Sequence, residues 1–534
     1  MRVLTGAEAA EVAAGREATS QLLIQRAGYA VAQFCIAEFK FRTVCVICGR
    51  GKNGSVGIAA ATILAGTATR VWVVVLAGEA NGHASVADEA LPQTVRPVWV
   101  LEESDFDGEV AKEALAADLI VDAIVGTGFR PPLRPLARAA IAAINRASGS
   151  VVSVDVPSGV ESDSVDPIRV AGGNMVFAQG ILALMAPKPA HISGELTSGP
   201  TAVSEIGVQP AMAGNSCGHL SAPTAQDVCV AFPRHSGMTE AESGHVLIVG
   251  GARGSAGTVA LAALAALRAG AGRVTIACPK SVETLIAAHG AALFTHGLPE
   301  TNSGSIAATA CDQIGELLVG KHAVLVGPGL FPNPQSDDFV RELTTESRVP
   351  VVIAGAALPA LARLSGEIGE STQAGTFRVV CLDAGEAVRW LGRTSQDNEK
   401  TEQAQLTKTL SRLSGACVVL HGSPTTIAGP SGEMWINLSG ASALAKAGMS
   451  EVLVGVTAAA VARVSSPSGT AFHMQFLRDL QVAAAVHLHG LATDIACSLR
   501  HEHALLPENV LEALPDAFRA CDRQAELGLF YLRS

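Results

Sequence analysis

Short apolar runs rich in valine and isoleucine alternate along the chain with alanine-rich stretches. Apolar runs of about four to eight residues are typical of strands that are buried on both faces, and the longer stretches between them suit helices. The alternation predicts an α/β protein in which helices cover both faces of parallel sheets. In the first part of the chain it predicts strands at Thr43–Cys48, Arg70–Leu76, Leu119–Ala123 and Ser150–Val156.

The alternation lapses between about Gly207 and Thr224, where glycine, proline, serine and asparagine follow one another without a period. A chain of 534 residues is also too long for one ordinary core. We therefore expect two α/β domains in series, over residues 1–215 and 225–534. In the second domain we expect helices at Thr258–Ala269 and Ala483–Leu499 and strands at His245–Gly250, Arg273–Ala277, Ala323–Val326, Val349–Ala354, Phe377–Leu382 and Cys417–His421.

Charge and composition narrow the choice of partners. The chain has 38 Lys and Arg against 49 Asp and Glu, a net charge of −11, and no long basic run, which disfavours nucleic acid. The longest nearly uncharged stretch, Ala256–Leu267, is too short for a bilayer, which needs about 20 apolar residues. Glu8, Glu11 and Arg16 lie where a signal peptide would be apolar, and the eleven scattered cysteines suit reduced thiols. We expect a cytoplasmic protein whose partners are small molecules or protein subunits.

Three glycine- or serine-bearing loops follow predicted strands of the first domain. One strand runs into Gly49–Gly54 and then into a helix that Ser55 is placed to cap. Such a turn presents backbone N–H groups to an anion. Two later strands end near Asp122 and Asp155, and the carboxyl ends of parallel strands meet at one edge of a sheet. The loops predict a binding crevice, although a tight turn without ligand and carboxylates that merely cap turns remain alternatives.

Together with RVLTGAEAAEV at the start, LLIQRAG at Leu22–Gly28 and APKPAHISG around Lys188, these loops resemble the NAD(P)H-hydrate epimerase family over about residues 1–208. The resemblance implies a Rossmann-like three-layer sandwich that epimerises C6 of the hydrated nicotinamide ring of NAD(P)HX beside a potassium ion. It implies that Asp155 contacts or protonates the ring. It further implies a substrate site of Lys52, Asn53, Gly126, Thr127 and Gly128, and potassium ligands from Asn53, Asp122 and Ser158.

The glycine loop departs from this family's pattern G-x-G-N-N-G-G-D-G. Lys52, Ser55 and Val56 stand where the family has Asn, Gly and Asp. Val56 cannot accept a hydrogen bond, so any ribose or ring contact made by the family's carboxylate is lost. The ammonium of Lys52 either takes the place of a monovalent ion or binds the substrate pyrophosphate.

The second domain contains HVLIVGGARGSAGTVA, LVGPGLFPNP and VHLHGLATDIA. These segments resemble the ADP-dependent NAD(P)H-hydrate dehydratase family, which has a ribokinase-like fold, over about Asp227 to Arg523. In this order the two domains are similar to the bifunctional NAD(P)H-hydrate repair family. The resemblance implies phosphorylation of the ring hydroxyl by ADP or ATP with Mg²⁺, then loss of phosphate to give NAD(P)H. It implies Glu451 as the base, Gly329 and Asp383 at the substrate, and a nucleotide site of His421, Gly422, Thr425, Gly448 and Ser450.

Several of these positions depart from the dehydratase pattern. The family's G-G-T-G-D reads Ala447–Glu451, so Glu451 replaces the Asp and Ser450 a Gly. His421 replaces a Lys, and Asp383 replaces a His. The substitutions predict a weak or absent dehydratase. The alternative is a non-catalytic paralogue that serves as a nucleotide-binding or assembly subunit beside an intact copy. The resemblance also implies a homo-oligomer.

Overall fold

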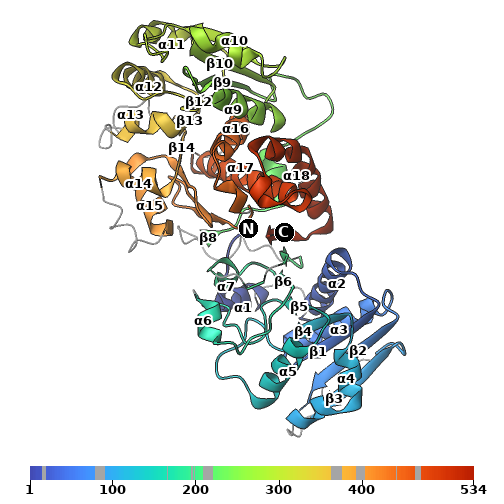
Figure 1. Ribbon diagram of the computed structural model, residues 1–534. Helices are drawn as coiled ribbons and strands as arrows, with labels where there is room; N and C mark the ends of the chain where they lie inside the picture. The colour runs from blue at the N-terminus through green and yellow to red at the C-terminus, as the bar shows by residue number, and fades with distance from the viewer. Residues whose placement is uncertain are drawn as a thin grey trace. The chain divides into compact units, whose positions relative to one another are not determined.

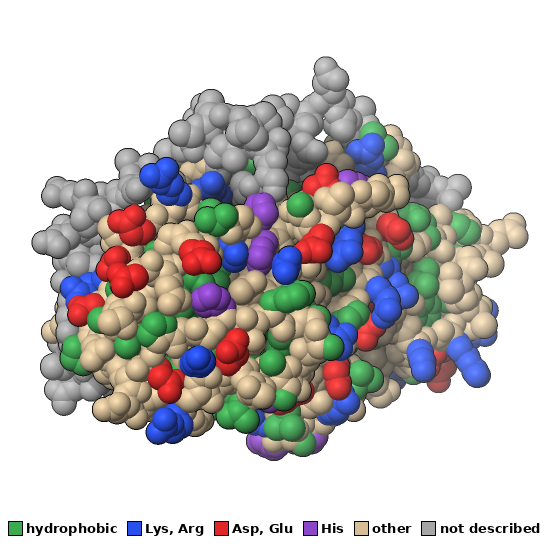
Figure 2. Space-filling view, turned by 90° about the horizontal axis from the view of Figure 1, so that it is seen from above, with side chains coloured by type: hydrophobic (Ala, Val, Ile, Leu, Met, Phe, Trp, Pro, Cys, Tyr) green, Lys and Arg blue, Asp and Glu red, His purple; other side chains and the backbone are tan. Residues whose placement is uncertain are grey.

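The computed structural model describes residues 1–14, 20–77, 91–164, 166–193, 196–197, 199–207, 220–362, 376–392, 403–440, 442–463 and 471–533. The chain forms two compact units (Figure 1). The first consists of Met1–Asn215 together with Glu526–Ser534, and the second of Ser216–Ala525. On the face seen in Figure 2, Lys and Arg side chains are interspersed with Asp and Glu, so neither sign of charge forms a block there.

The first unit contains an eight-stranded sheet in the order β18-β7-β6-β5-β4-β1-β2-β3. The pairings are parallel except that of β18 with β7. The sequence predicted β1, β2 and β4 with these bounds, and β5 ends two residues early because Asp155 adopts a left-handed conformation with φ of 70°. The strands are β1 Thr43–Cys48, β2 Arg70–Leu76, β3 Val95–Val100, β4 Leu119–Ala123, β5 Ser150–Val154, β6 Gly180–Leu184, β7 Thr201–Ser204 and β18 Phe530–Arg533.

Helices cover both faces of this sheet, as expected for a three-layer sandwich (Figure 1). Strand β1 shows why: Val44 and Val46 belong to the core under α2 and α3, whereas Cys45 and Ile47 belong to the core under α4 and α5. The helices are α1 Gly6–Ala14, α2 Ser20–Glu38, α3 Lys52–Leu64, α4 Glu109–Leu115, α5 Pro135–Arg146, α6 Pro167–Ala171 and α7 Pro189–Ser193.

The strand order of the first unit reverses between β1 and β4. The chain builds β1, β2 and β3 toward one edge, then returns to place β4, β5, β6 and β7 on the other side of β1. In open parallel sheets, ligands bind at the carboxyl ends of the strands where the order reverses, because the flanking loops diverge there. The fold therefore places its crevice at the loops after β1 and β4.

The second unit contains a ten-stranded sheet in the order β11-β10-β9-β12-β13-β14-β15-β16-β17-β8. It is parallel from β11 to β15 and antiparallel from β15 to β17. Its strands are β8 Leu220–Ser221, β9 His245–Val249, β10 Arg273–Pro279, β11 Phe294–Leu298, β12 Ala323–Val326, β13 Val351–Ala354, β14 Arg378–Leu382, β15 Cys417–Leu420, β16 Thr425–Ala428 and β17 Met434–Asn437. The strands that we predicted here lie within one or two residues of these bounds.

Helices pack on this second sheet around a core of valine, isoleucine and leucine. Within the described residues, Gln475–Leu499 of α17 is long and apolar enough to cross a membrane by length and composition, but 72% of its apolar window is buried inside the chain, as in a core helix. The helices are α8 Ala225–Ala231, α9 Ala256–Arg268, α10 Glu283–Ala287, α11 Ile314–Leu318, α12 Pro334–Glu346, α13 Leu358–Ala362, α14 Ala384–Trp390, α15 Gln403–Ser414, α16 Met449–Ala462, α17 Ala471–Leu499 and α18 Pro507–Leu527.

The last strand of the chain belongs to the first unit. β18 pairs antiparallel with β7, and Leu529 packs in the core under α2 and α3. The expectation that residues 225–534 form one domain is therefore wrong for the final segment. The physical reason is that the apolar run Leu529–Leu532 follows a left-handed Gly528, which lets it cover the open edge of β7.

Two leucines of this segment test its role. Leu529 is 1% exposed, whereas Leu527 is 52% exposed. We expect Leu529→Ala to destabilise the first unit by about 2–5 kcal/mol, because it removes buried methyl groups and leaves a cavity. Leu527→Ala is the matched control and should change little. Urea-dependent hydrogen exchange of peptides from the first unit measures both; equal stabilities for the two variants would contradict a structural role for β18.

Candidate functional site

A cavity of about 960 Å³ opens in the first unit at the carboxyl ends of β1, β4 and β5. Its polar wall comes from the loops after these strands, and its apolar wall comes from α1 and α2. Six of the residues assigned from the sequence line it together: Lys52, Asn53, Gly126, Thr127, Gly128 and Asp155. The crevice expected from the glycine loops is therefore present, and it collects residues from three separate segments.

Two glycines allow these loops to approach one another. A Cβ on Gly49 would lie 1.9 Å from the carbonyl oxygen of Ile124, so the β1 and β4 loops meet at backbone distance. A Cβ on Gly126 would lie 3.2 Å from Asn53 Oδ1 and 3.3 Å from Asp155 Oδ2. The absence of a side chain at Gly126 thus lets the amide and the carboxylate converge on the cavity.

The helix that follows the first loop starts earlier than predicted. α3 begins at Lys52, and its N-cap is Gly51 in an extended conformation with φ of −100°. The expectation that Ser55 caps the helix is wrong, because Ser55 lies inside its first turn. Since Gly51 makes no side-chain cap, the first N–H groups of α3 face the cavity mouth without a capping side chain.

A buried ion pair forms the polar centre of the cavity. Lys188 Nζ lies 2.5 Å from Asp155 Oδ1 and also donates to the carbonyl of Leu184 at 2.6 Å. The backbone N–H groups of Leu184 and Thr127 donate to the same carboxylate at 3.2 and 3.3 Å. Burial by itself raises the pKa of Asp155, but the Lys188 ammonium and these hydrogen bonds outweigh it and hold the pKa below the usual value of 3.8. Asp155 is therefore ionised at neutral pH.

His191 holds the backbone of this pair. Its Nδ1 accepts the N–H of Lys188 at 2.9 Å, so the ring proton lies on Nε2, which donates to the carbonyl of Asp155 at 2.8 Å. Burial, together with the Lys188 charge, lowers the pKa of His191 to about 4, so the ring is neutral at neutral pH. The imidazole thus anchors Asp155 in its left-handed conformation and fixes the start of α7 at the same time.

The sequence did not assign a role to Lys188 or His191. Both stand in APKPAH, directly after the apolar run that forms β6. A lysine at the carboxyl end of a buried strand was the available signal, since such a position faces the same edge as Asp122 and Asp155. Their pairing with Asp155 depends on β6 lying next to β5, which only the fold provides.

Asp122 is fully buried and does not line the cavity. Ser158 donates to it through its hydroxyl at 2.6 Å and its N–H at 2.8 Å, and the Ser153 hydroxyl donates at 2.9 Å. Burial raises its pKa despite these bonds, and none of the ion pairs among the described residues involves it. Asn53 donates to the carbonyl of Val154 at 3.4 Å, which leaves its Oδ1 facing Gly126.

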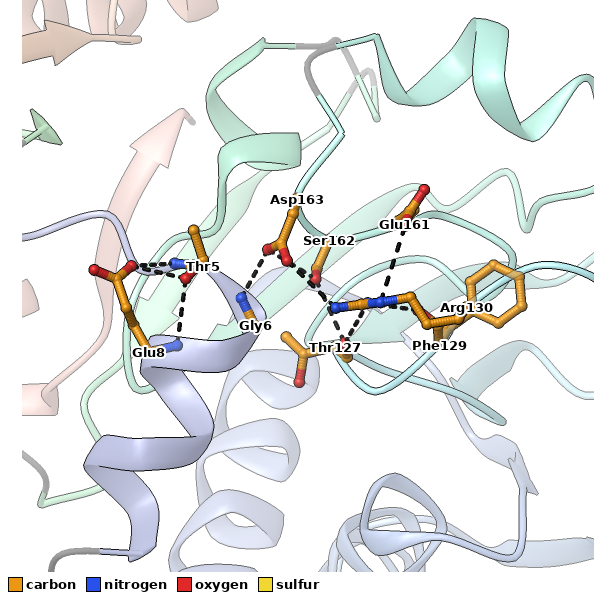
Figure 3. Close-up of polar contacts among 9 residues, drawn as sticks. All are labelled: Thr5, Gly6, Glu8, Thr127, Phe129, Arg130, Glu161, Ser162 and Asp163. Carbon is orange, nitrogen blue, oxygen red and sulfur yellow. Dashed lines mark hydrogen bonds and ion pairs between the residues drawn. The ribbon is translucent and has the colours of Figure 1, made fainter.

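The apolar wall is connected through Asp163 to the loop that follows β4, as Figure 3 shows. The Gly6 N–H at the start of α1 donates to Asp163 Oδ1 at 2.7 Å, while Arg130 pairs with Asp163 Oδ2 at 3.4 Å. Arg130 also donates to the carbonyl of Thr127 at 3.3 Å. Helix α1 and the loop after β4 therefore form one connected side of the cavity.

In the second unit, three of the assigned residues gather near the start of α16. Burial lowers the pKa of His421 to about 4, although the negative charge of Asp383 raises it, so the imidazole is neutral at neutral pH. Burial is the largest cause that raises the pKa of Glu386, and the charges of Asp383 and Glu451 raise it further. Asp383 caps α14 and accepts the Glu386 N–H at 2.7 Å. Three carboxylates therefore lie in this group beside a neutral imidazole, and the charge of Arg389 acts on Glu386 in the opposite direction by lowering its pKa.

The remaining assigned residues form the turns around this group. Gly448 is the N-cap of α16 with φ of 93°, and Ser450 lies in the first turn. Thr425 donates to the carbonyl of Gly422 at 3.1 Å, and Gln403 covers this turn by donating to the carbonyls of Leu420 and Pro424 at 3.2 and 2.9 Å. Gly329 accepts the Ser255 hydroxyl at 2.5 Å next to α9. The sequence missed Gln403, which has no motif of its own.

The buried Asp155–Lys188 pair predicts how much stability the loss of Lys188 costs and how that cost depends on pH. Lys188→Met should destabilise the first unit by about 3–5 kcal/mol at pH 7, because it leaves a buried carboxylate without its cation. The stability that comes from the lowered pKa is complete above pH 3.8 and is lost as the pH falls through the folded-state value. In the variant, burial raises the pKa of Asp155, so its deficit relative to the wild type should shrink as the pH falls.

Urea unfolding at pH 7 and at pH 4 measures this deficit. The control is Arg169→Met, which removes an exposed partner of Asp166 and should change stability little at either pH. A deficit that does not depend on pH would contradict an ionised Asp155 in the folded protein.

Comparison with known proteins finds a matching family for each unit. The family described as "YjeF-related protein N-terminus" matches residues 20–190, and the family described as "NAD(P)H-hydrate dehydratase" matches residues 246–516. The bifunctional NAD(P)H-hydrate repair enzyme of Moorella thermoacetica is 31% identical over 525 residues, which is 95% of this chain and 94% of that protein. The repair enzyme of Escherichia coli is 26% identical over 499 residues, covering 92% of this chain and 88% of that protein.

A solved ADP/ATP-dependent NAD(P)H-hydrate dehydratase from Bacillus subtilis, co-crystallised with ATP and Mg²⁺, is 22% identical. It covers 56% of this chain and 99% of its own, with a TM-score of 0.46. The two family matches and the near full-length relatives decide the assignment: the chain belongs to the family of bifunctional NAD(P)H-hydrate repair enzymes.

Proposed function

We propose that the first unit interconverts the R and S epimers of NAD(P)HX and that the second unit dehydrates NAD(P)HX to NAD(P)H in a nucleotide-dependent reaction. The observation that carries the first half is the Asp155–Lys188 pair at the centre of a cavity large enough for a nucleotide. The family assignment supports both halves and gives no preference to the non-catalytic alternative.

The chemistry of C6 explains why a paired acid and base suit the epimerase. C6 carries a hydroxyl and is bonded to the ring nitrogen, whose lone pair can expel the hydroxyl once a proton has been added to it. We assign that proton to the Lys188 ammonium, and water leaves to give a planar iminium. Water then adds to either face, Asp155 accepts its proton, and the proton returns to Lys188. Both groups end in their initial state, so the pair supports repeated turnover.

Potassium beside the substrate belongs to this proposal. Asp122, Ser158 and Asn53 offer carboxylate, hydroxyl and amide oxygens, which suit a hard cation. Asp122 supports the assignment further, because it is a buried carboxylate and the described ion pairs leave it without a cationic side chain. A bound ion would supply that charge and lower the pKa of Asp122. The residues therefore fit the ion, and they would hold the loop after β4 in place.

The dehydratase half rests on the group at the start of α16. Glu451 is the proposed base that takes the proton of the ring hydroxyl while the hydroxyl receives phosphate from ADP or ATP with Mg²⁺. The N–H groups at Gly448 and Ser450 are the proposed donors to the transferring phosphate, and Gly448 has the left-handed conformation that this turn needs. The neutral His421 is a weaker phosphate partner than a lysine.

Self-association remains part of the proposal. Leu22, Tyr29 and Ile36 lie seven residues apart on α2 and are 38%, 56% and 39% exposed. That spacing puts them on one face of the helix, which supports an apolar contact with a second copy. A cytoplasmic location also remains a prediction from the sequence.

The two activities should separate by mutation. Asp155→Asn should slow epimerisation by about 10²–10⁴-fold while leaving dehydration intact, because it removes the base of the first unit only. Glu451→Gln should do the reverse. The assay mixes protein with NADHX, ADP, Mg²⁺ and K⁺, and follows NADH absorbance together with the R to S ratio by chromatography.

Asp166→Asn, a half-exposed aspartate of the first unit, is the control for the epimerase and should behave like wild type. Epimerisation at the wild-type rate in Asp155→Asn would sink the assignment of Asp155. Recovery of NADH by Glu451→Gln at the wild-type rate would sink that of Glu451.

A substitution at the proposed nucleotide site is expected to increase the affinity for ADP. His421→Lys should tighten ADP binding by about tenfold, because an ammonium makes charge-assisted hydrogen bonds that a neutral imidazole does not make. Calorimetry with ADP and Mg²⁺ measures the change, and the exposed His235→Lys is the control for added charge. Equal affinities for wild type and His421→Lys would show that residue 421 does not face the nucleotide.

A further inference from the structure

The cavity of the first unit is strongly cationic. Five basic side chains and one acidic side chain line it: Arg50, Lys52, Arg130, Arg134, Lys188 and Asp155. This excess contrasts with the chain as a whole, which carries a net charge of −11. A cavity of the opposite sign to its protein attracts and binds anionic ligands, and it loses that advantage as salt rises.

Two of the five cations are already neutralised within the protein. Lys188 lies 2.5 Å from Asp155, and Arg130 lies 3.4 Å from Asp163 (Figure 3). The other three, Arg50, Lys52 and Arg134, are exposed at the cavity wall, and no ion pair among the described residues involves them. Three positive charges are thus available to a ligand.

The available cations form two groups. Arg50 lies in the loop between β1 and α3 and Lys52 is the first residue of α3, whereas Arg134 directly precedes α5. Helices α3 and α5 pack on opposite faces of the sheet, so the two groups flank the crevice from different sides. A pyrophosphate is one compact anion with about two charges, which one group is sufficient to bind. The second group indicates a second anion on the same ligand.

Given the proposed function, we propose that this cavity selects the 2′-phosphorylated substrate, NADPHX, over NADHX, with one cationic group bound to the pyrophosphate and the other to the 2′-phosphate. The two substrates differ only in that phosphate monoester. A phosphate monoester carries about −1.5 to −2 charge at pH 7 and three acceptor oxygens. Lysine and arginine are the side chains that bind such groups through charge-assisted hydrogen bonds.

The first experiment compares kcat/KM for epimerisation of NADPHX and NADHX by the full chain at about 50 mM and about 500 mM salt. We expect a preference of about tenfold for NADPHX at low salt, falling toward parity at high salt because exposed cations are screened. A ratio at or below one at low salt overturns the inference, even if both substrates are epimerised and the proposed function stands.

Variants assign the preference to the cavity. Lys52→Met combined with Arg134→Met should lower kcat/KM for both substrates but should lower it more for NADPHX, which brings the ratio near one. Arg138→Met is the matched control: Arg138 lies one turn further along α5, is exposed and does not line the cavity, so the ratio should keep its wild-type value. An unchanged ratio in the double variant overturns the assignment to these residues.

Binding separates this inference from the proposed function. Calorimetry with adenosine 2′,5′-bisphosphate and with 5′-AMP reports the 2′-phosphate without any turnover. We expect the bisphosphate to bind at least about fivefold more tightly to wild type and to Arg138→Met, and the difference to disappear in the double variant. If neither substrate is epimerised, the proposed function fails while this comparison still decides the selectivity. Equal binding of the two probes by wild type overturns the inference.

Discussion

The charge pair between Asp155 and Lys188 is the constraint on which the first unit depends. A buried carboxylate is costly unless it is paired and hydrogen-bonded, and here Lys188 and two backbone N–H groups satisfy it, while His191 holds the backbone carbonyl of Asp155. The same contacts end β5, seat the start of α7 and keep Asp155 in a left-handed conformation. The contacts that stabilise this corner of the fold therefore also hold in place the ammonium and the carboxylate that we propose as proton donor and proton acceptor.

The carboxyl edge of the sheet places the loops that form the cavity around that pair. Because the strand order reverses between β1 and β4, the loops after these strands diverge and leave a cavity, and β5 and β6 supply Asp155 and Lys188 next to it. Gly49 lets the loops after β1 and β4 meet at backbone distance, and Gly126 leaves room for the side chains of Asn53 and Asp155 to converge. Helix α1 forms part of the apolar side of the cavity and is connected through Asp163 to the loop after β4. Contacts between separate segments therefore hold this wall in place.

The charges around the proposed site of the second unit differ from those of the cavity in the first unit. Around the start of α16 the second unit gathers Asp383, Glu386 and Glu451 with Arg389 and a neutral His421, so carboxylates outnumber the cation of this group where a nucleotide is proposed to bind. A polyphosphate at this place needs Mg²⁺ and backbone N–H groups to offset that charge. The cavity of the first unit is cationic instead. On the proposed function, the first unit therefore binds phosphate with Lys and Arg side chains, and the second unit binds it with Mg²⁺ and backbone N–H groups.

The sequence by itself determined the α/β class, the boundary near residue 215, most strand bounds and the motif positions that identify the family, because these depend on local apolar periodicity and on short segments. It did not determine that the chain returns to the first unit as β18, that Gly51 rather than Ser55 starts α3, or that Lys188 and His191 clamp Asp155. Those facts depend on which strands are neighbours and on contacts between residues far apart in the chain. Only the tertiary structure decides such contacts, since burial and pairing energies arise once the segments are packed together.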